Sequence, residues 1–345
     1  MSVFALHPMA KRRLIIEQVA ARRGILPVII EKDFWVCWIL GRIYATPAMA
    51  SSVVFKGGTS LSKVFGIIER FSEDADLSVT PASLGFSDTD LDDAPSASQR
   101  IKRMRSLAHA CEECVVERFQ PALEAAISEI LGTPASQPSW LKYELDSMAG
   151  TPNLWFRYPS VLPQAGGYIA KQVKLELGAL TDQQPTGNHV IQPMLADVLG
   201  EVFEDFSVSV VALELERTFW EKATILHAEY HRPATQPLRD RLARHYSDMA
   251  ALWQHPSSSK ALARLDLLQD VVRHKSRFFA SSWASYDTAI PGSFHLVPPA
   301  FRQGELARDL ESMQPMFLVS PPSFSELLKQ LAEAEADLNT KFFHG

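Results

Sequence analysis

Two aspartates, Asp74 and Asp76, stand one residue apart in the stretch ERFSEDADLSV, residues 69–79. The alternation from residue 74 to residue 79 predicts a β-strand, and residues two apart on a strand point to the same face of its sheet. Two carboxylates held together repel each other, and a bound divalent cation is the usual reason for such a pair. We therefore expect a metal site at these aspartates, with a solvent-exposed acidic pair as the alternative.

A third acid, Glu176, lies in a later segment, KQVKLELG at residues 171–178. Apolar residues alternate there with Lys174 and Glu176, so a strand would have one apolar face and one polar face. If this strand lies beside that of the aspartates, three carboxylates surround one site. Such a site suits one or two Mg²⁺ ions and the triphosphate that they would bridge. The alternative is an amphipathic edge strand with a Lys/Glu surface pattern.

The residues before the aspartates are suited to phosphate. The motif Gly57-Gly58-Thr59-Ser60 follows a short β-branched run and precedes a helix-compatible segment. Glycines let the backbone approach a ligand, a helix N-terminus presents free N–H groups, and hydroxyls can bond phosphate oxygens. The spacing of a P-loop is absent. A tight turn in which Thr59 caps the helix is the alternative.

Two basic residues complete the candidate nucleotide site. Lys63 lies in the helix-compatible segment that follows the glycines, and Arg70 comes shortly before the strand of Asp74. Arg70 would contact phosphate or would merely neutralise Glu69 and Glu73.

The elements that must position these residues follow from hydrophobic periodicity and turn residues. We predict strands at 53–56, 74–79, 153–158, 168–177 and 208–213, a turn at 164–167, a loop or insertion at 81–98 and a turn-rich break at 181–189. We predict helices at 8–23, 28–46, 99–132 (one helix, or two joined at Pro121), 214–230, 238–253 and 323–339. Strands concentrate in the first two-thirds, so the chain is of the α+β class.

The composition is that of an ordinary globular protein, with 345 residues of which 46% are hydrophobic and 21% charged. We predict two packed domains, a core at 1–213 with an inserted loop and helix region at 81–150, and a helical C-terminal domain at 214–345 that contributes to the site. A net charge of −6 argues against a protein that coats nucleic acid. Three cysteines, no apolar signal-peptide core and no apolar run of ~20 residues predict a cytoplasmic protein outside the membrane.

The order of these elements resembles the polymerase-β type of nucleotidyltransferase fold. That order is a strand, Gly-Gly-Thr-Ser, a short helix, Asp-x-Asp on the next strand and a later acid on a third strand. More closely, the chain resembles the AbiEii/AbiGii toxin family, which includes the MenT toxins, from about residue 28 to the C-terminal helix. The matching segments are EKDFW (31–35), FKGGTSLSKVF (55–65), ERFSEDADLSV (69–79), KLELG (174–178), RTFWEKATILHAE (217–229), RHYSDMAAL (244–252) and MQPMFLVSPPSFSELL (313–328).

The resemblance implies a mixed sheet with flanking helices, followed by a mainly helical C-terminal region. It assigns metal binding to Asp74, Asp76 and Glu176, triphosphate binding to Gly58, Thr59 and Ser60, and catalytic roles to Asp74, Asp76, Lys222 and Asp248. The residues themselves are compatible with this, because a lysine that follows Phe219-Trp220 on an apolar helix is half-buried and needs an anionic partner. A triphosphate or Asp248 would serve.

The resemblance also implies a function. The chain would be a Mg²⁺-dependent nucleotidyltransferase toxin of a toxin–antitoxin system that transfers a nucleotide from an NTP to the 3′ end of tRNA, blocking translation and growth. A winged-helix antitoxin would be encoded nearby. One alternative is transfer to a hydroxyl of a protein or small molecule, and another is a non-catalytic nucleotide-binding regulator. The crowded carboxylates and the glycine pair speak against the regulator, since an inert protein has no reason to keep them.

Overall fold

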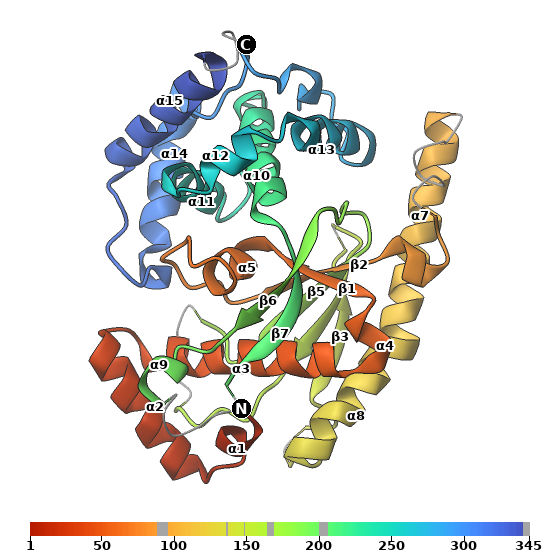
Figure 1. The fold of residues 1–345 in the computed structure, drawn as a ribbon, viewed down its shortest axis with the longest axis vertical. Coiled ribbons are helices and arrows are strands. Elements are labelled where there is room, and N and C mark those ends of the chain that lie inside the picture. The colour runs from red at the N-terminus through yellow and green to blue at the C-terminus, as the bar shows by residue number, and fades with distance from the viewer. Residues whose placement is uncertain (88–95, 136, 148, 164–168, 200–205, 341–345) are drawn as a thin grey trace. The chain divides into compact units, whose positions relative to one another are not determined.

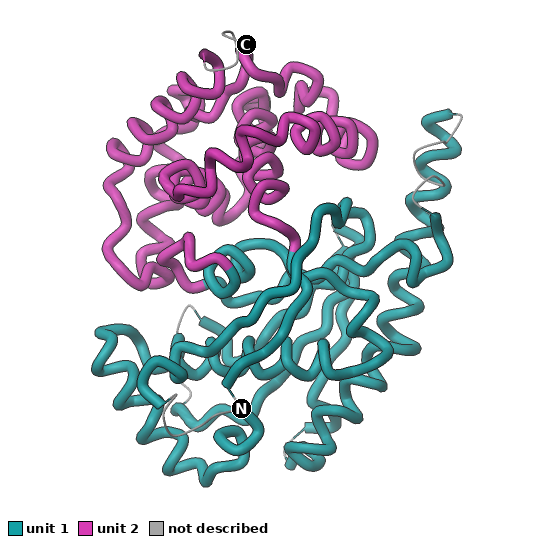
Figure 2. Tube along the Cα trace, in the orientation of Figure 1, with its two compact units in different colours: residues 1–64, 72–212 teal, residues 65–71, 213–345 magenta. Residues whose placement is uncertain are grey.

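The computed structural model describes residues 1–87, 96–135, 137–147, 149–163, 169–199 and 206–340. Figure 2 shows the two compact units into which the chain divides. Unit 1 comprises residues 1–64 and 72–212, and unit 2 comprises residues 65–71 and 213–345. None of the helices in the described residues has both the length and the apolar character that crossing a bilayer requires.

Unit 1 is built on a mixed sheet in which the described residues form seven strands, in the order β3-β4-β5-β2-β1-β7-β6 (Figure 1). The strands are β1 (Val53–Lys56), β2 (Ala75–Val79), β3 (Leu141–Leu145), β4 (Pro152–Phe156), β5 (Val173–Gly178), β6 (Thr186–Ile191) and β7 (Val208–Leu213). β2 runs antiparallel to β1 and parallel to β5, so the strand that follows Asp74 is an interior strand.

The helical segments of unit 1 surround this sheet. They are α1 (Ser2–Ala5), α2 (Met9–Arg23), α3 (Pro27–Ala45), α4 (Pro47–Ala50), α5 (Gly57–Lys63), the 3₁₀ turn η1 (Pro81–Leu84), α7 (Ala97–Cys114), the π-helical turn η2 (Val115–Phe119), α8 (Gln120–Leu131) and α9 (Ala196–Leu199). Figure 1 shows α3 crossing one face of the sheet, and α3 packs against β5 and α8.

The core of unit 1 is aromatic where α3 meets the sheet. Trp35 and Trp38 are buried and lie 5.9 and 5.6 Å, between ring centroids, from Phe156 of β4. Burying one side chain of this size contributes about 2–3 kcal/mol. Pro27 is the first residue of α3, where its missing N–H costs nothing.

Unit 2 is helical in its described part. Its elements are α10 (Leu215–Tyr230), α11 (Ala243–Gln254), α12 (Ser258–Leu262), α13 (Leu265–Phe278), the 3₁₀ turn η3 (Tyr286–Thr288), α14 (Ala300–Ser312), the 3₁₀ turn η4 (Gln314–Met316) and α15 (Phe324–Thr340). α10 packs against α11, α12 and α13, and α11 packs against α14 and α15. Residues 65–71 belong to this unit through backbone bonds from Phe71 N to Met316 O (2.6 Å) and from Leu318 N to Glu69 O (2.9 Å).

The predicted α+β class is confirmed, with a mixed sheet followed by a helical C-terminal part. Seven predicted elements agree with the structure within one residue at either end. They are the helices at 8–23, 28–46, 214–230 and 323–339 and the strands at 53–56, 74–79 and 208–213. The strand predicted at 153–158 is present and ends at residue 156. The turn predicted at 164–167 and residues 88–95 of the predicted loop lie outside the described residues.

Three predictions of secondary structure were wrong in part, and one strand was missed. Strand β3 was missed, and β6 occupies the end of the predicted break at 181–189. Both strands end the sheet and carry exposed polar residues, so their alternation resembles that of a loop. The strand predicted at 168–177 begins only at Val173, and the helix predicted at 238–253 begins only at Ala243.

The helical region predicted at 99–132 agrees with the first of the two expected arrangements, one helical segment with no break at Pro121. α7, η2 and α8 follow one another without a break, and the irregularity is the π-helical turn at 115–119. Pro121 lies in the first turn of α8, and a π-turn changes the hydrogen-bond pattern just where proline supplies no donor. The chain therefore continues as one helical segment.

Candidate active site

The turn between β1 and α5 brings a glycine against one of the aspartates. Lys56, the last residue of β1, pairs with Asp76 of β2, and Gly57 follows with a φ of 80°. A Cβ atom at Gly57 would lie 2.8 Å from Cγ of Asp76 and closer still to Oδ2. Only glycine satisfies both conditions, because this φ disfavours other residues and the carboxylate occupies the space of a side chain.

The hydroxyls of the glycine motif are both engaged with backbone oxygens. Thr59 Oγ1 donates to the carbonyl oxygen of Asp74, and Ser60 Oγ donates to that of Gly57 at 2.9 Å. Both side chains are fully buried. The Thr59 bond fastens α5 to the backbone of Asp74, and the Ser60 bond lies within α5. Phosphate binding by Gly57, Gly58, Thr59 and Ser60 stays a prediction.

The acidic residues are brought to neighbouring positions of the sheet. Asp76 and Glu176 are register partners in β2 and β5, and Asp74 immediately precedes β2. Glu176 accepts a hydrogen bond from Lys174 at 2.9 Å, because residues two apart share one face of β5. Among the described residues, no group of three His, Cys, Asp or Glu side chains is arranged to hold a metal ion. The predicted metal triad is thus adjacent in register, with Glu176 turned toward Lys174.

Electrostatics set Asp74 apart from an ordinary surface acid. Burial raises its pKa to about 6, and the negative charges of Glu73 and Asp76 act in the same direction, while Lys32 and Lys174 oppose them. A cation bound between carboxylate oxygens would remove this cost. The chemistry of Asp74 and Asp76 therefore fits a hard divalent ion such as Mg²⁺, which prefers oxygen ligands.

Three consecutive charged residues of α3, in the segment EKDFW, have buried side chains that bond to segments near the aspartates. Glu31, Lys32 and Asp33 are all buried. Lys32 Nζ donates to Glu73 Oε2 at 2.8 Å, and Glu31 accepts from Val161 N at 2.6 Å. The signal for these roles was available, since three consecutive charges in an otherwise apolar helix require buried partners.

Lys63, a predicted nucleotide ligand, forms an ion pair with Asp33. Burial alone would lower the pKa of Lys63, but the charge and hydrogen bond of Asp33, together with Cys37, outweigh burial and raise the pKa. Lys63 Nζ also lies 3.4 Å from the carbonyl oxygen of Gln192. The ion pair with Asp33 thus anchors α5 to α3, and a role of Lys63 in nucleotide binding stays a prediction.

Unit 2 contains the other three predicted site residues in one buried network. Arg70 donates from Nε and Nη2 to the two carboxylate oxygens of Asp248, at 2.8 and 2.9 Å. Lys222 Nζ lies 2.8 Å from Asp248 Oδ2 and 3.0 Å from His245 Nδ1. Of the partners expected for Lys222 the structure shows Asp248, and Asp248 is also a partner of Arg70.

The network is electrostatically stable because two cations face one carboxylate. Burial alone would raise the pKa of Asp248, but the charges and hydrogen bonds of Arg70 and Lys222 outweigh it and hold the pKa well below its usual range. Burial lowers the pKa of Lys222 despite Asp248, and the charges of Arg70 and Arg244 add to this effect. Burial next to Lys222 also keeps the pKa of His245 far below normal, so this imidazole is neutral.

Comparison with protein-family models identifies the family. Residues 38–330 match the model described as nucleotidyl transferase AbiEii toxin, type IV toxin–antitoxin system. The chain belongs to the AbiEii toxin family. The resemblance stated from the sequence motifs is confirmed, and the AbiEii chain is a nucleotidyltransferase toxin of a type IV system.

Solved structures include a similar protein. The AbiEii chain resembles MenT4, a nucleotidyltransferase toxin from Mycobacterium tuberculosis H37Rv, with a TM-score of 0.42 and 14% sequence identity. The likeness covers 95% of this chain and 99% of MenT4. A search of curated proteins found no match.

Proposed function

We propose that this AbiEii toxin uses Mg²⁺ to transfer a nucleotide from an NTP to the 3′ end of tRNA in the cytoplasm, and that a winged-helix antitoxin encoded nearby counteracts it. The observation that carries the proposal is the position of Asp76 against the backbone of Gly57, beside the half-buried Asp74, whose pKa is raised to about 6. This arrangement supports a site in which carboxylates and a side-chain-free backbone lie together, as metal-assisted phosphoryl transfer requires.

The chemistry assigned to the chain follows from these contacts. Asp74 and Asp76 would hold the metal, with Glu176 as a third ligand once it leaves Lys174. Mg²⁺ would supply neutralisation of phosphate charge. The acceptor hydroxyl attacks the α-phosphorus, the bond to the bridging oxygen of the β-phosphate breaks, pyrophosphate leaves, and the hydroxyl proton passes to a base. Because Gly57 has no side chain, the carboxylate of Asp76 can lie against the backbone at this turn.

Lys222 and Asp248 keep their proposed catalytic roles in unit 2, with Asp248 orienting the lysine. The 2.8 Å bond between them and the burial of Asp248 support the orienting role. Because the pKa of Lys222 is lowered, an additional anion next to its amine would favour the charged form. Phosphate is such an anion.

The test is a transfer assay with the purified toxin, Mg²⁺ or EDTA, each labelled NTP in turn, and total tRNA, protein or small-molecule hydroxyl acceptors. We expect label in tRNA only, and only with Mg²⁺. The variants Asp76→Asn and Lys222→Met should lose transfer and toxicity together. Label in protein would assign a different acceptor, and full toxicity of Asp76→Asn would contradict an enzymatic mechanism.

A further inference from the structure

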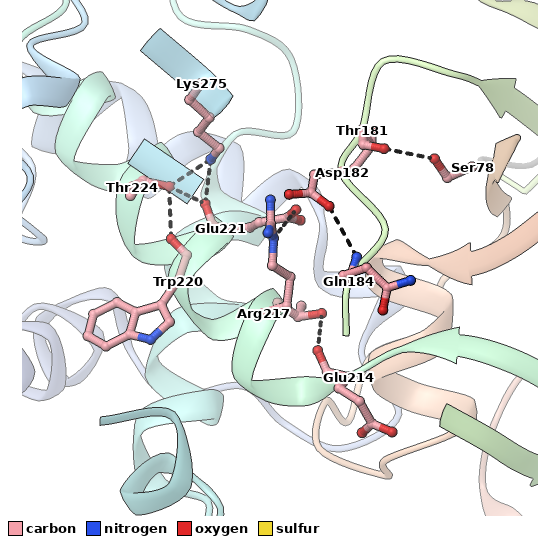
Figure 3. Close-up of polar contacts among 11 residues, drawn as sticks. Ser78, Thr181, Asp182, Gln184, Glu214, Arg217, Trp220, Glu221, Thr224 and Lys275 are labelled. Atoms are coloured by element: carbon pink, nitrogen blue, oxygen red, sulfur yellow. Dashed lines mark hydrogen bonds and ion pairs between the residues drawn. The ribbon is translucent and has the colours of Figure 1, made fainter. Parts of the chain in front are cut away.

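Lys275 of α13 is a cation bound only to neutral oxygens in its described contacts. Its Nζ donates to the carbonyl oxygen of Glu221 at 2.7 Å and to Thr224 Oγ1 at 2.8 Å, as Figure 3 shows. Thr224 Oγ1 in turn lies 2.8 Å from the carbonyl oxygen of Trp220, its own α10 neighbour one turn back. A lysine ammonium has three N–H donors, so one donor remains beyond these two contacts.

The charges around Lys275 are mostly of its own sign. Burial lowers its pKa to about 7; the carboxylate of Glu221 opposes this shift, and the positive charges of Arg217 and Lys222 add to it. Glu221 is not dedicated to Lys275, because its Oε1 lies 3.4 Å from Arg217 Nε. These three charged groups all belong to α10. The 3₁₀ turn η3 also packs against α13, and its Asp287 acts on His227.

A purely structural role explains little of this arrangement. The carbonyl oxygen of Glu221 lies inside α10, where the helix itself already supplies a donor. Thr224 Oγ1 also lies 3.0 Å from this oxygen, so a further bond from Lys275 contributes little, whereas moving an ammonium partly out of water near the two cations Arg217 and Lys222 is costly. A methionine would fill the same space without that cost. The cost would be repaid by an anion that reaches the remaining donor.

We propose that Lys275 is a phosphate-binding position of the toxin, at which its ammonium donates a hydrogen bond to a phosphate oxygen of a nucleotide or of an RNA strand, within the field of Arg217 and Lys222. The proposal rests on the proposed function for the choice between these two phosphate sources. Phosphate is the anion that both substrates share, and an ammonium binds it through charge and a hydrogen bond together.

The free lysine is about half neutral at pH 7, because its pKa is about 7. Binding of a phosphate favours the ammonium form, so a complex that uses Lys275 must take up a proton. The uptake approaches roughly half a proton per site at pH 7 and most of a proton at pH 8, and it falls toward zero at pH 6. A lysine with a merely structural role gives no ligand-linked uptake.

The experiment is titration calorimetry of the full chain in buffers of different ionisation enthalpy, with two probes, a non-hydrolysable NTP analogue and an unmodified tRNA transcript. The probe that shows proton uptake identifies the phosphate source. We expect Lys275→Met to weaken binding of that probe at least tenfold and to abolish the uptake. Lys275→Arg should keep most of the affinity without uptake, because arginine stays charged.

The matched control is Arg273→Met, which removes an exposed cation from the same helix and should leave affinity and uptake unchanged. Wild-type affinity and uptake in Lys275→Met for both probes, or no uptake with either probe in the wild type, would overturn the proposal. Circular dichroism checks folding, and if Lys275→Met is unfolded, Lys275→Arg carries the test. Binding is measured without turnover, so a toxin that labels no tRNA contradicts the proposed function and leaves this result standing.

Discussion

Replacing Gly57 by alanine tests whether the close approach of Asp76 to the β1–α5 turn is needed for activity. The new Cβ would lie 2.8 Å from Asp76 Cγ and closer to Oδ2, while ordinary contact begins at 3.4 Å. Cγ must therefore move by at least 3.4 minus 2.8, or about 0.6 Å, and Oδ2 by more. Misplacing a reacting group by about 1 Å costs on the order of 10²-fold in rate. We expect Gly57→Ala to lose about that factor in nucleotide transfer.

Gly85 provides a matched control for the backbone. Its φ is 82°, against 80° at Gly57, and a Cβ there meets nothing within 4 Å. Both alanine variants carry the strain of a left-handed residue, about 1–2 kcal/mol, but only Gly57→Ala displaces the carboxylate. The assay compares transfer rates and urea unfolding of the two variants. Equal loss of transfer in both, or wild-type transfer in Gly57→Ala, would refute the assignment of Asp76 to the reaction.

Two further predictions concern unit 2. Asp248→Asn leaves Arg70 and Lys222 buried without the Asp248 carboxylate, so it should destabilise the protein by about 3–5 kcal/mol in urea unfolding. The double variant Arg70→Met/Asp248→Leu should be more stable than Asp248→Asn. Equal stability of the two variants would contradict the ion-pair explanation. Burial lowers the pKa of His227 from 6.5 to about 4, so the unfolded chain binds more protons between these pH values, and the stabilisation is complete above pH 6.5 and lost as pH falls toward 4. The contribution of His227 to the loss is at most about 3 kcal/mol, from 1.36 kcal/mol per pKa unit, and a pH series of unfolding curves should show a smaller loss in His227→Gln than in the wild type.

The predictable parts of the fold are those whose sequence pattern is determined by burial. α3 and α10 have strong apolar faces and β1 is a β-branched run, so their limits agree with the structure. The strands β3 and β6 lie at the ends of the sheet, where one neighbour is missing and polar residues are tolerated. Periodicity alone does not separate such a strand from a loop.

The candidate site was predictable in its residue types but not in its partners. A strand with residues two apart on one face suffices to place Asp74 and Asp76 together. Thr59 was expected to bind phosphate or cap a helix, whereas its hydroxyl donates to the backbone of Asp74. Which oxygen accepts the hydrogen bond of the Thr59 hydroxyl depends on the tertiary packing around α5, and the spacing of residues in the sequence does not predict that packing.

The buried charges of α3 explain how a helix as short as α5 can hold a fixed position beside the aspartates. α5 spans only residues 57–63, too short for its own hydrogen bonds to stabilise it. Its C-terminal end is tied through Lys63 to Asp33, and the strand after it is tied through Glu73 to Lys32. Two adjacent residues of one rigid helix thus fix both sides of the Gly57–Asp76 approach. A buried ion pair adds little net stability to the fold, but a conformation that separates its two charges is strongly destabilised. The ion pairs of Asp33 and Lys32 therefore hold the backbone around Asp74 and Asp76 in one conformation, although these two carboxylates repel each other.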